Sequence, residues 1–267
     1  MKYMGGKSRL AHIICSEINS IALNENIDNY YEPFVGGGAI IEQVNIKNRY
    51  GSDLNNYLIA LYKYFQDTDK FEYPNITREQ FEHIRKNKEQ YPEWLVAWCG
   101  FYCSFNTRWF ACWGGDYFDK QGIYCNKQLG AYNSILQEIP IIKNIDFKNC
   151  SYKDVNIIPH SIVYCDAPYI GTKQYEGAKE EFNFDEYYSW LKETAKNNFV
   201  LISEYRMPVQ DFKSIKTIEV AGFLSTSGNN KVESREQTEC IEQLFVVRGG
   251  YLVDKYYHDE EDNTYDF

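Results

Sequence analysis

The chain has 267 residues, of which 44% are hydrophobic and 17% aromatic. Apolar side chains are frequent enough to form a sizeable core, which excludes an intrinsically disordered chain. The net charge of −10 argues against a protein that grips phosphates. However, residues 254–267 hold six acidic side chains against one lysine, which is half of that charge. We therefore expect an acidic C-terminal tail on a chain that is otherwise only mildly acidic.

No apolar stretch of the sequence is long enough to span a bilayer, and residues 2–22 lack the uninterrupted apolar run of an export signal. We expect an intracellular, cytoplasmic protein with no membrane partner. The eight cysteines include no C-x-x-C pair, so we expect them to be reduced thiols. Four of them could together hold zinc: Cys99, Cys103, Cys112 and Cys125. Their spacing matches no common zinc-finger pattern, and we expect no metal.

The first part of the chain alternates between segments of helical and strand character. Apolar residues at helical spacing predict the first helix, and short apolar runs predict strands. The predicted elements are a helix over 10–23, a strand over 30–35, a helix over 39–47, a strand over 49–52 and a helix over 55–66. This alternation is typical of an α/β domain with a parallel sheet.

The alternation stops near residue 67 and resumes at Ile145. Between these points Thr77 is a suitable N-cap for a helix over 78–88. The other expected elements are a helix over 92–105, a loop or short hairpin over 106–130, a short helix over 132–138, and strands over 161–165, 200–203 and 240–248. We therefore expect a catalytic domain made of 1–65 and 138–253, a mainly helical insert at 66–137 and a tail at 254–267.

The tetrapeptide D-A-P-Y at residues 166–169 follows the apolar run 161–165, which predicts a buried strand. At such an edge the acid and a backbone carbonyl can accept hydrogen bonds from an amine, and the aromatic ring can stack on a nucleobase. The segment resembles the D-P-P-Y motif of amino-methyltransferases, which methylate exocyclic amines of flipped bases. Ala167 replaces the first proline. Alanine keeps the carbonyl and loses only the fixed φ of proline.

Further segments resemble the same family in the same order. E-P-F-V-G-G-G at 32–38 is similar to its glycine loop, which binds S-adenosylmethionine (SAM). Asp53 ends the next predicted strand, where an acid holds ribose hydroxyls in Rossmann-like folds. K-Y-M-G-G-K at 2–7 resembles the segment that closes over SAM in Dam-type DNA adenine methyltransferases. The chain is thus identified as a member of the Dam-type alpha class, also called D12.

This resemblance implies a Rossmann-like SAM-dependent methyltransferase sheet with a target-recognition insert, and site-specific methylation of adenine N6 in double-stranded DNA. A flipped adenine would attack the SAM methyl directly, in a restriction-modification or phage-modification setting. The implied catalytic residues are Asp166, Ala167, Pro168 and Tyr169. The implied SAM-binding residues are Tyr3, Lys7, Glu32, Pro33, Phe34, Gly36, Gly38, Asp53 and Asp166.

The insert is the expected reader of DNA. Asn106 and Arg108 carry the side chains best suited to adenine and guanine edges. Further cations there and just after the catalytic turn are Lys120, Lys127 and Lys173. Aromatic side chains of the insert could wedge into DNA, but for each one we favour a place in the insert's own small core. These aromatics are Trp109, Phe110, Trp113, Tyr117 and Phe118.

Two other functions stay open from the sequence. The same chemistry on planar amines also serves methyltransferases that act on RNA or on a protein amide. Alternatively, the chain is a catalytically disabled SAM-binding protein, with Ala167 marking a damaged motif. A methylation assay on DNA, RNA and protein separates these functions.

Overall fold

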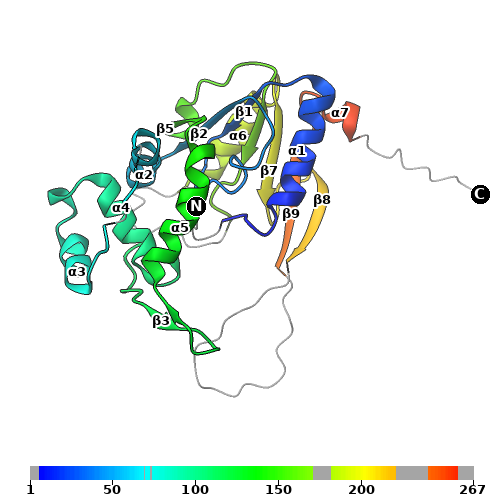
Figure 1. Ribbon diagram of the computed structural model, residues 1–267. Coiled ribbons are helices and arrows are strands. Elements are labelled where there is room, and N and C mark those ends of the chain that lie inside the picture. The colour runs from blue at the N-terminus through cyan, green and yellow to red at the C-terminus, as the bar shows by residue number, and fades with distance from the viewer. Residues whose placement is uncertain (1–5, 69, 73, 171–181, 221–239, 258–267) are drawn as a thin grey trace, which may run out of the picture. The chain divides into compact units, whose positions relative to one another are not determined.

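The computed structural model describes residues 6–68, 70–72, 74–170, 182–220 and 240–257 (Figure 1). The chain divides into two compact units, residues 1–162 and 163–267. Each unit combines strands with helices, so the predicted α/β class is confirmed. In the described part of the chain, no helix has the length and apolar character needed to cross a lipid bilayer.

Parallel strands form the sheet of the first unit. They are β1 (Asn29–Glu32), β2 (Asn48–Asp53) and β5 (Ile145–Asn149), in the order β5-β2-β1. Tyr31 lies opposite Tyr50, and Tyr50 opposite Asp146. Parallel strands end at one common edge of their sheet, so the segments after β1 and β2 begin close together. β1 ends at Glu32, earlier than the predicted limit at residue 35.

Helices α1 (Ala11–Glu25) and α2 (Asn56–Asp67) confirm two predicted helices. Asn55 begins α2 as its N-cap, since its side chain accepts a hydrogen bond from the amide of Leu58. Tyr62 of α2 stacks on Phe147 of β5, with 4.1 Å between the ring centroids. This contact packs α2 against strand β5 of the sheet.

The helix predicted over 39–47 is wrong, because this segment forms successive turns. In a helix the carbonyl of Ile41 would accept a hydrogen bond from the amide of Asn45. Instead, that carbonyl accepts a hydrogen bond from Arg49, and the amide of Asn45 donates to the side chain of Asn19. Two helical hydrogen bonds remain, from the amide of Glu42 to Gly38 and from that of Val44 to Ile40. Side chains from α1 and β2 replace the next one, so the segment does not continue as a helix.

The insert is mainly helical, as predicted. It contains α3 (Arg78–Lys86), α4 (Glu93–Tyr102), the hairpin strands β3 (Tyr117–Phe118) and β4 (Tyr124–Cys125), and α5 (Lys127–Ile142), in cyan to green in Figure 1. Short 3-10 turns lie at Lys88–Gln90, Phe105–Thr107 and, after β5, Tyr152–Asp154. Thr77 caps α3 through a capping box, which confirms its predicted role.

Helix α5 is longer than the predicted 132–138, since Asn126 caps its start and Pro140 is accommodated inside it. Aromatic rings fill the interior of the insert around the fully buried Trp98. The preference for core positions is wrong for two aromatics of the hairpin, because Tyr117 is 56% and Phe118 70% exposed. A two-stranded hairpin has no second layer to cover its side chains.

The second unit contains strands in the order β6-β7-β9-β8. Its elements are β6 (Ile162–Cys165), α6 (Phe184–Thr194), β7 (Phe199–Glu204), β8 (Phe212–Val220), β9 (Cys240–Val247) and α7 (Val253–Tyr256). Strand β9 is antiparallel to both β7 and β8. Tyr164 of β6 is hydrogen-bonded to Ser203 of β7 at 2.7 Å, which ties the two buried strands together near their carboxyl ends.

Candidate functional site

The glycine loop follows β1 and is tied to the end of β2. The amide of Val35 donates to the carbonyl of Ser52 at 2.9 Å, and the amide of Gly36 donates to Oδ2 of Asp53 at 3.1 Å. Gly36 and Gly38 have φ values of 45° and 72°, which favour glycine. The loop and Asp53, predicted from spacing to serve one nucleoside, are therefore in direct contact.

The carboxylate of Asp53 is oriented by backbone amides. Its Oδ1 accepts a hydrogen bond from the amide of Asn55 at 2.9 Å, in addition to the bond from Gly36. Burial raises the pKa of Asp53, and these amide hydrogen bonds oppose that rise. A carboxylate has about four acceptor positions, so acceptor capacity remains for ribose hydroxyls.

Tyr62 is a residue of this site that the sequence analysis assigned only to the apolar face of a helix. Its hydroxyl donates to the carbonyl of Gly36 at 3.0 Å. A Cβ atom placed on Gly38 would lie 2.6 Å from the same hydroxyl, closer than side-chain packing permits. Tyr62 therefore supports the glycine loop from α2. No local motif marks this role.

Glu32 and Phe34 border the loop on its strand side. Glu32 is buried, and its Oε2 accepts a hydrogen bond from the hydroxyl of Tyr30 at 2.8 Å. Burial, with the charge of Glu32 as the second cause, raises the pKa of the Cys15 thiol to about 12. Phe34 packs on Tyr152, with ring centroids 5.3 Å apart. Pro33 is part of the turn between β1 and the glycines.

The predicted N-terminal arm is described only in part. The carbonyl of Lys7 accepts a hydrogen bond from the amide of Leu10, immediately before α1. The Lys7 side chain is half-buried. Tyr3 lies outside the described residues, as does Lys173 of the predicted DNA-binding set.

The D-A-P-Y turn follows β6 directly, as the sequence analysis expects. All four residues of β6 are buried, Asp166 is half-buried and Ala167 is 7% exposed. The hydroxyl of Tyr169 donates to Oε1 of Glu242, on β9, at 2.8 Å. Burial raises the pKa of Tyr169, and the charges of Asp166 and Glu242 raise it further, so the phenol stays a neutral hydrogen-bond donor.

Glu204, at the end of β7, binds two backbone amides close to the ring of Tyr169. Its Oε2 accepts a hydrogen bond from the amide of Ile170 at 3.3 Å, and its Oε1 accepts one from the amide of Tyr205 at 2.7 Å. The rings of Tyr169 and Tyr205 are edge to face, with centroids 4.7 Å apart. Neither Glu204 nor Glu242 was predicted as a site residue.

The predicted DNA-binding residues of the insert have different surroundings. Asn106, Arg108 and Lys120 are exposed. Asn106 has a φ of 51°, in the left-handed region that asparagine tolerates. Lys127, the first residue of α5, is half-buried and its Nζ donates to the carbonyl of Ser104. Burial lowers the pKa of Lys127. Lys127 therefore joins the start of α5 to the segment that follows α4.

The hairpin β3–β4 carries an exposed apolar surface, which we call the hairpin patch. Its residues are Tyr117, Phe118, Ile123 and Tyr124, which are 56–70% exposed. The rings of Phe118 and Tyr124 are in contact, with centroids 5.7 Å apart, and the hydroxyl of Tyr124 donates to Asp116. Clustered exposed aromatics are typical of a surface that binds a partner.

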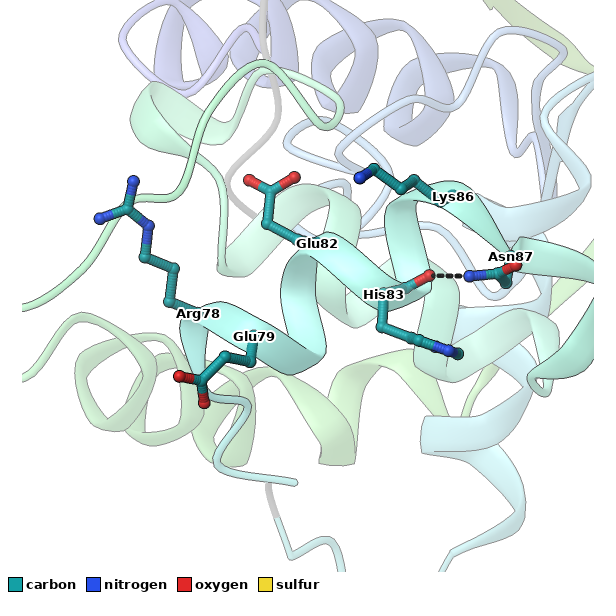
Figure 2. A pocket seen from close by; sticks show the side chains of 6 residues that line it. All are labelled: Arg78, Glu79, Glu82, His83, Lys86 and Asn87. Carbon is teal, nitrogen blue, oxygen red and sulfur yellow. Dashed lines mark hydrogen bonds between the residues drawn. The ribbon is translucent and has the colours of Figure 1, made fainter.

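A shallow hollow runs along α3, and Figure 2 shows the polar side chains that line it: Arg78, Glu79, Glu82, His83, Lys86 and Asn87. The Nδ2 of Asn87 donates to the carbonyl of His83, as the dashed line marks. Opposite charges alternate along this helix and none of the lining residues is buried. The hollow is typical of a solvated helix face.

Among the residues that the structure describes, no three His, Cys, Asp or Glu side chains are grouped as a metal site would require. Cys99 and Cys103 are buried in α4 and directly after it, whereas Cys112 is exposed. The thiol of Cys103 donates to Oε1 of Gln128 at 3.4 Å.

Comparison with known proteins places the chain in a family. No curated protein matches it. A solved structure, SMU.472, described as a candidate methyltransferase complexed with SAH, is 12% identical, with a TM-score of 0.33. The match covers 87% of this chain and 52% of the other, so this chain spans about half the length of that protein. Residues 3–221 match the family described as D12 class N6 adenine-specific DNA methyltransferase. The chain therefore belongs to the D12 class N6 adenine-specific DNA methyltransferase family.

Proposed function

We propose that this protein transfers a methyl group from SAM to N6 of a flipped adenine in double-stranded DNA. The observation that carries the proposal is the D-A-P-Y turn at residues 166–169, which follows a fully buried strand and keeps its aromatic ring fixed by a hydrogen bond. An acceptor, a carbonyl and an aromatic ring in this order suit an exocyclic amine on a planar base. Family membership supports adenine as that base.

The glycine loop and Asp53 fit the nucleoside part of SAM. Asp53 lies at the carboxyl end of β2, and β1 ends in the glycine loop beside it, which is the edge where parallel sheets bind nucleotides. Leu54, directly after Asp53, is 71% exposed, so it offers an apolar surface for the adenine ring of the cofactor. Lys7, Glu32, Phe34 and the arm residue Tyr3 complete the proposed set.

SAM supplies an electrophilic methyl group on a sulfonium centre. The chain's own residues orient the target amine. Asp166 and the carbonyl of Ala167 accept its two N–H hydrogen bonds, which draws the nitrogen lone pair out of conjugation and aims it at the methyl group. Tyr169 stacks on the flipped base. Ala167 retains this chemistry, since only the carbonyl of residue 167 takes part.

The insert supplies the proposed contacts with DNA. Asn106 and Arg108 are exposed beside α4, and Lys120 is exposed in the loop of the hairpin. The hairpin patch adds aromatic side chains that can enter a base stack opened by flipping. Arg108 and Lys120 supply positive charge locally, although the chain has a net negative charge, half of which lies at residues 254–267.

A methylation assay tests this function. Purified protein and methyl-labelled SAM are incubated with DNA from a host without methylation, with RNA and with protein extract. We expect label on DNA at N6 of adenine, none on the others, and one short sequence context when the modified bases are mapped. Label on RNA or protein alone would replace DNA as the substrate.

Two variants connect the assay to the D-A-P-Y turn. Asp166→Ala should abolish methyl transfer, because the acceptor for the amine is gone. SAM should still bind although Asp166 belongs to the implied SAM-binding set, because other residues make the proposed nucleoside site. Ala167→Pro should retain activity. A wild type that is inactive on every substrate, but active as Ala167→Pro, would show that the chain is a disabled methyltransferase.

A further inference from the structure

We propose that Glu242 and Glu204 are positioning residues, which hold the ring of Tyr169 and the end of the D-A-P-Y turn in the orientation that receives the flipped base. Neither residue belongs to a motif of the chain. The inference rests on the proposed methyltransferase function and deepens it, because it assigns to β7 and β9 a role in capture of the target base.

The first contact is the hydrogen bond from the Tyr169 hydroxyl to Oε1 of Glu242, at 2.8 Å. A stacking ring needs only its face, so its hydroxyl is free to serve as an anchor. Because Glu242 lies within the regular strand β9, its carboxylate is a fixed point. The bond holds the hydroxyl end of Tyr169 and so restricts rotation of its ring.

The second contact fixes the backbone next to the ring. The two carboxylate oxygens of Glu204 accept hydrogen bonds from the amides of Ile170 and Tyr205. Ile170 follows Tyr169 in the chain, so Glu204 connects the end of the turn to the end of β7. Tyr205 then packs edge to face on Tyr169, at 4.7 Å between centroids.

Side chains of β8 and β9 in turn hold Tyr205. The side chain of Gln243 donates to the carbonyl of Tyr205 at 3.0 Å, and the hydroxyl of Ser214 donates to Oε1 of Gln243 at 2.8 Å. Strands β8 and β9 therefore hold Tyr205 in place, and Tyr205 in turn limits the rotation of Tyr169.

Burial is the reason to assign this arrangement to function. Glu204 is 6% and Glu242 is 7% exposed. Removal of a carboxylate from water is unfavourable unless hydrogen bonds compensate. Apolar side chains at both positions would stabilise a sheet more simply. One buried carboxylate bonded to the Tyr169 hydroxyl and a second bonded to the amide of the next residue are typical of a preorganised site.

The experiment measures methyl transfer and base flipping in five proteins: wild type, Tyr169→Phe, Glu242→Leu, Glu242→Gln and the double variant Tyr169→Phe/Glu242→Leu. Substrates are unmethylated DNA for kinetics and duplexes with 2-aminopurine at the target adenine for fluorescence, once the modified site has been mapped. SAM affinity is measured in parallel. Asp211→Asn, which alters an exposed ion pair with Lys192 in the same unit, is the control.

We expect Glu242→Leu and Tyr169→Phe each to raise the KM for DNA by about 10- to 150-fold, from the loss of one hydrogen bond to a charged group, and to lower the 2-aminopurine signal. SAM affinity should stay unchanged. The double variant should be no worse than either single variant, since both remove the same bond. Glu242→Gln should remain within about 3-fold of wild type, because the amide oxygen still accepts.

The outcomes distinguish failure of the proposed methyltransferase function from failure of the positioning role. A wild type that binds SAM but methylates no DNA would overturn the proposed function. An active wild type with Glu242→Leu unchanged in KM and fluorescence, or with additive losses in the double variant, would overturn only the positioning role. Unfolding of the same five proteins in urea identifies losses that come from instability: Glu242→Leu should lose base flipping under conditions in which it is fully folded.

Discussion

The carboxylate of Asp53 and the backbone amide of Gly36 are hydrogen-bonded at 3.1 Å, although 17 residues separate them in the sequence. The contact joins the end of β2 to the loop after β1. One acid therefore orders the glycine loop and keeps further oxygen lone pairs with which it can accept hydrogen bonds from the proposed cofactor.

Replacement of Asp53 should weaken SAM binding. Asp53→Ala removes the acceptor for ribose hydroxyls and for the Gly36 amide, so we expect a loss of about 1–3 kcal/mol in calorimetric binding free energy. Asp146→Ala, an exposed acid on the neighbouring strand β5, should bind as wild type does. Equal SAM affinity in Asp53→Ala and wild type would remove Asp53 from the cofactor site.

Gly38 tests the fit between the loop and α2. Gly38→Ala places a Cβ atom 2.6 Å from the Tyr62 hydroxyl at a φ of 72°, and we expect a loss of about 1–3 kcal/mol in unfolding free energy. Tyr62→Phe removes the hydroxyl that the new methyl group would meet. Gly38→Ala should therefore cost less in the Tyr62→Phe background than alone. An identical cost in both backgrounds would show that only the backbone conformation matters.

Local patterns predicted most of this architecture. The glycine loop and the D-A-P-Y turn follow strands and Asp53 ends one, so strand prediction and spacing were sufficient to place them. The Thr77 capping box is equally local. Such features depend on neighbours within a few residues, and propensity and turn chemistry act over that range.

The features that the sequence analysis missed depend on distant residues. The predicted helix over 39–47 does not form beyond Val44, because Asn19 and Arg49 take the backbone groups of Asn45 and Ile41 that would pair next. Glu242 bonds Tyr169 of the D-A-P-Y turn from 73 residues further along the chain, and Glu204 bonds Ile170, directly after the turn, from 34 residues further along. Strand β8 was not predicted, and an irregularity between Ser214 and Lys216 interrupts its alternation.

Arg108 tests the assignment of the insert as DNA reader. Arg108→Ala should weaken DNA binding with SAM affinity unchanged, because the side chain is exposed on the insert. A contact with a base would lower discrimination at one position by about 1–3 kcal/mol. A phosphate contact would weaken all sequences alike and reduce the salt dependence. Arg85→Ala, on the charged face of α3, is the control. If Arg108→Ala leaves DNA affinity and sequence preference unchanged, Arg108 does not contact DNA and has a structural role.

Lys127 should behave differently from Arg108. Its Nζ donates to the carbonyl of Ser104, so Lys127→Ala leaves a buried residue's carbonyl without that donor. We expect a loss of about 1–3 kcal/mol in unfolding free energy, measured in urea. Arg108→Ala should leave unfolding unchanged within about 0.5 kcal/mol, as is usual for exposed sites. A stable Lys127→Ala with weakened DNA binding would return Lys127 to the DNA contacts.

Glu42 gives the protein a pH-dependent stability. Burial, with the charge of Glu138 as a contributing cause, raises the pKa of Glu42 from 4.5 to about 7 in the folded state, and Arg49 opposes this rise. A raised folded pKa stabilises the protein at low pH, and this contribution disappears as the pH rises through 7. Relative to Glu42→Gln, wild type should therefore lose about 2 kcal/mol of unfolding free energy between pH 5.5 and 8. Glu138→Gln should shift the loss to lower pH, since it removes the neighbouring charge. Urea unfolding at both pH values measures this difference, and a constant difference between wild type and Glu42→Gln would show that Glu42 ionises normally in the folded protein.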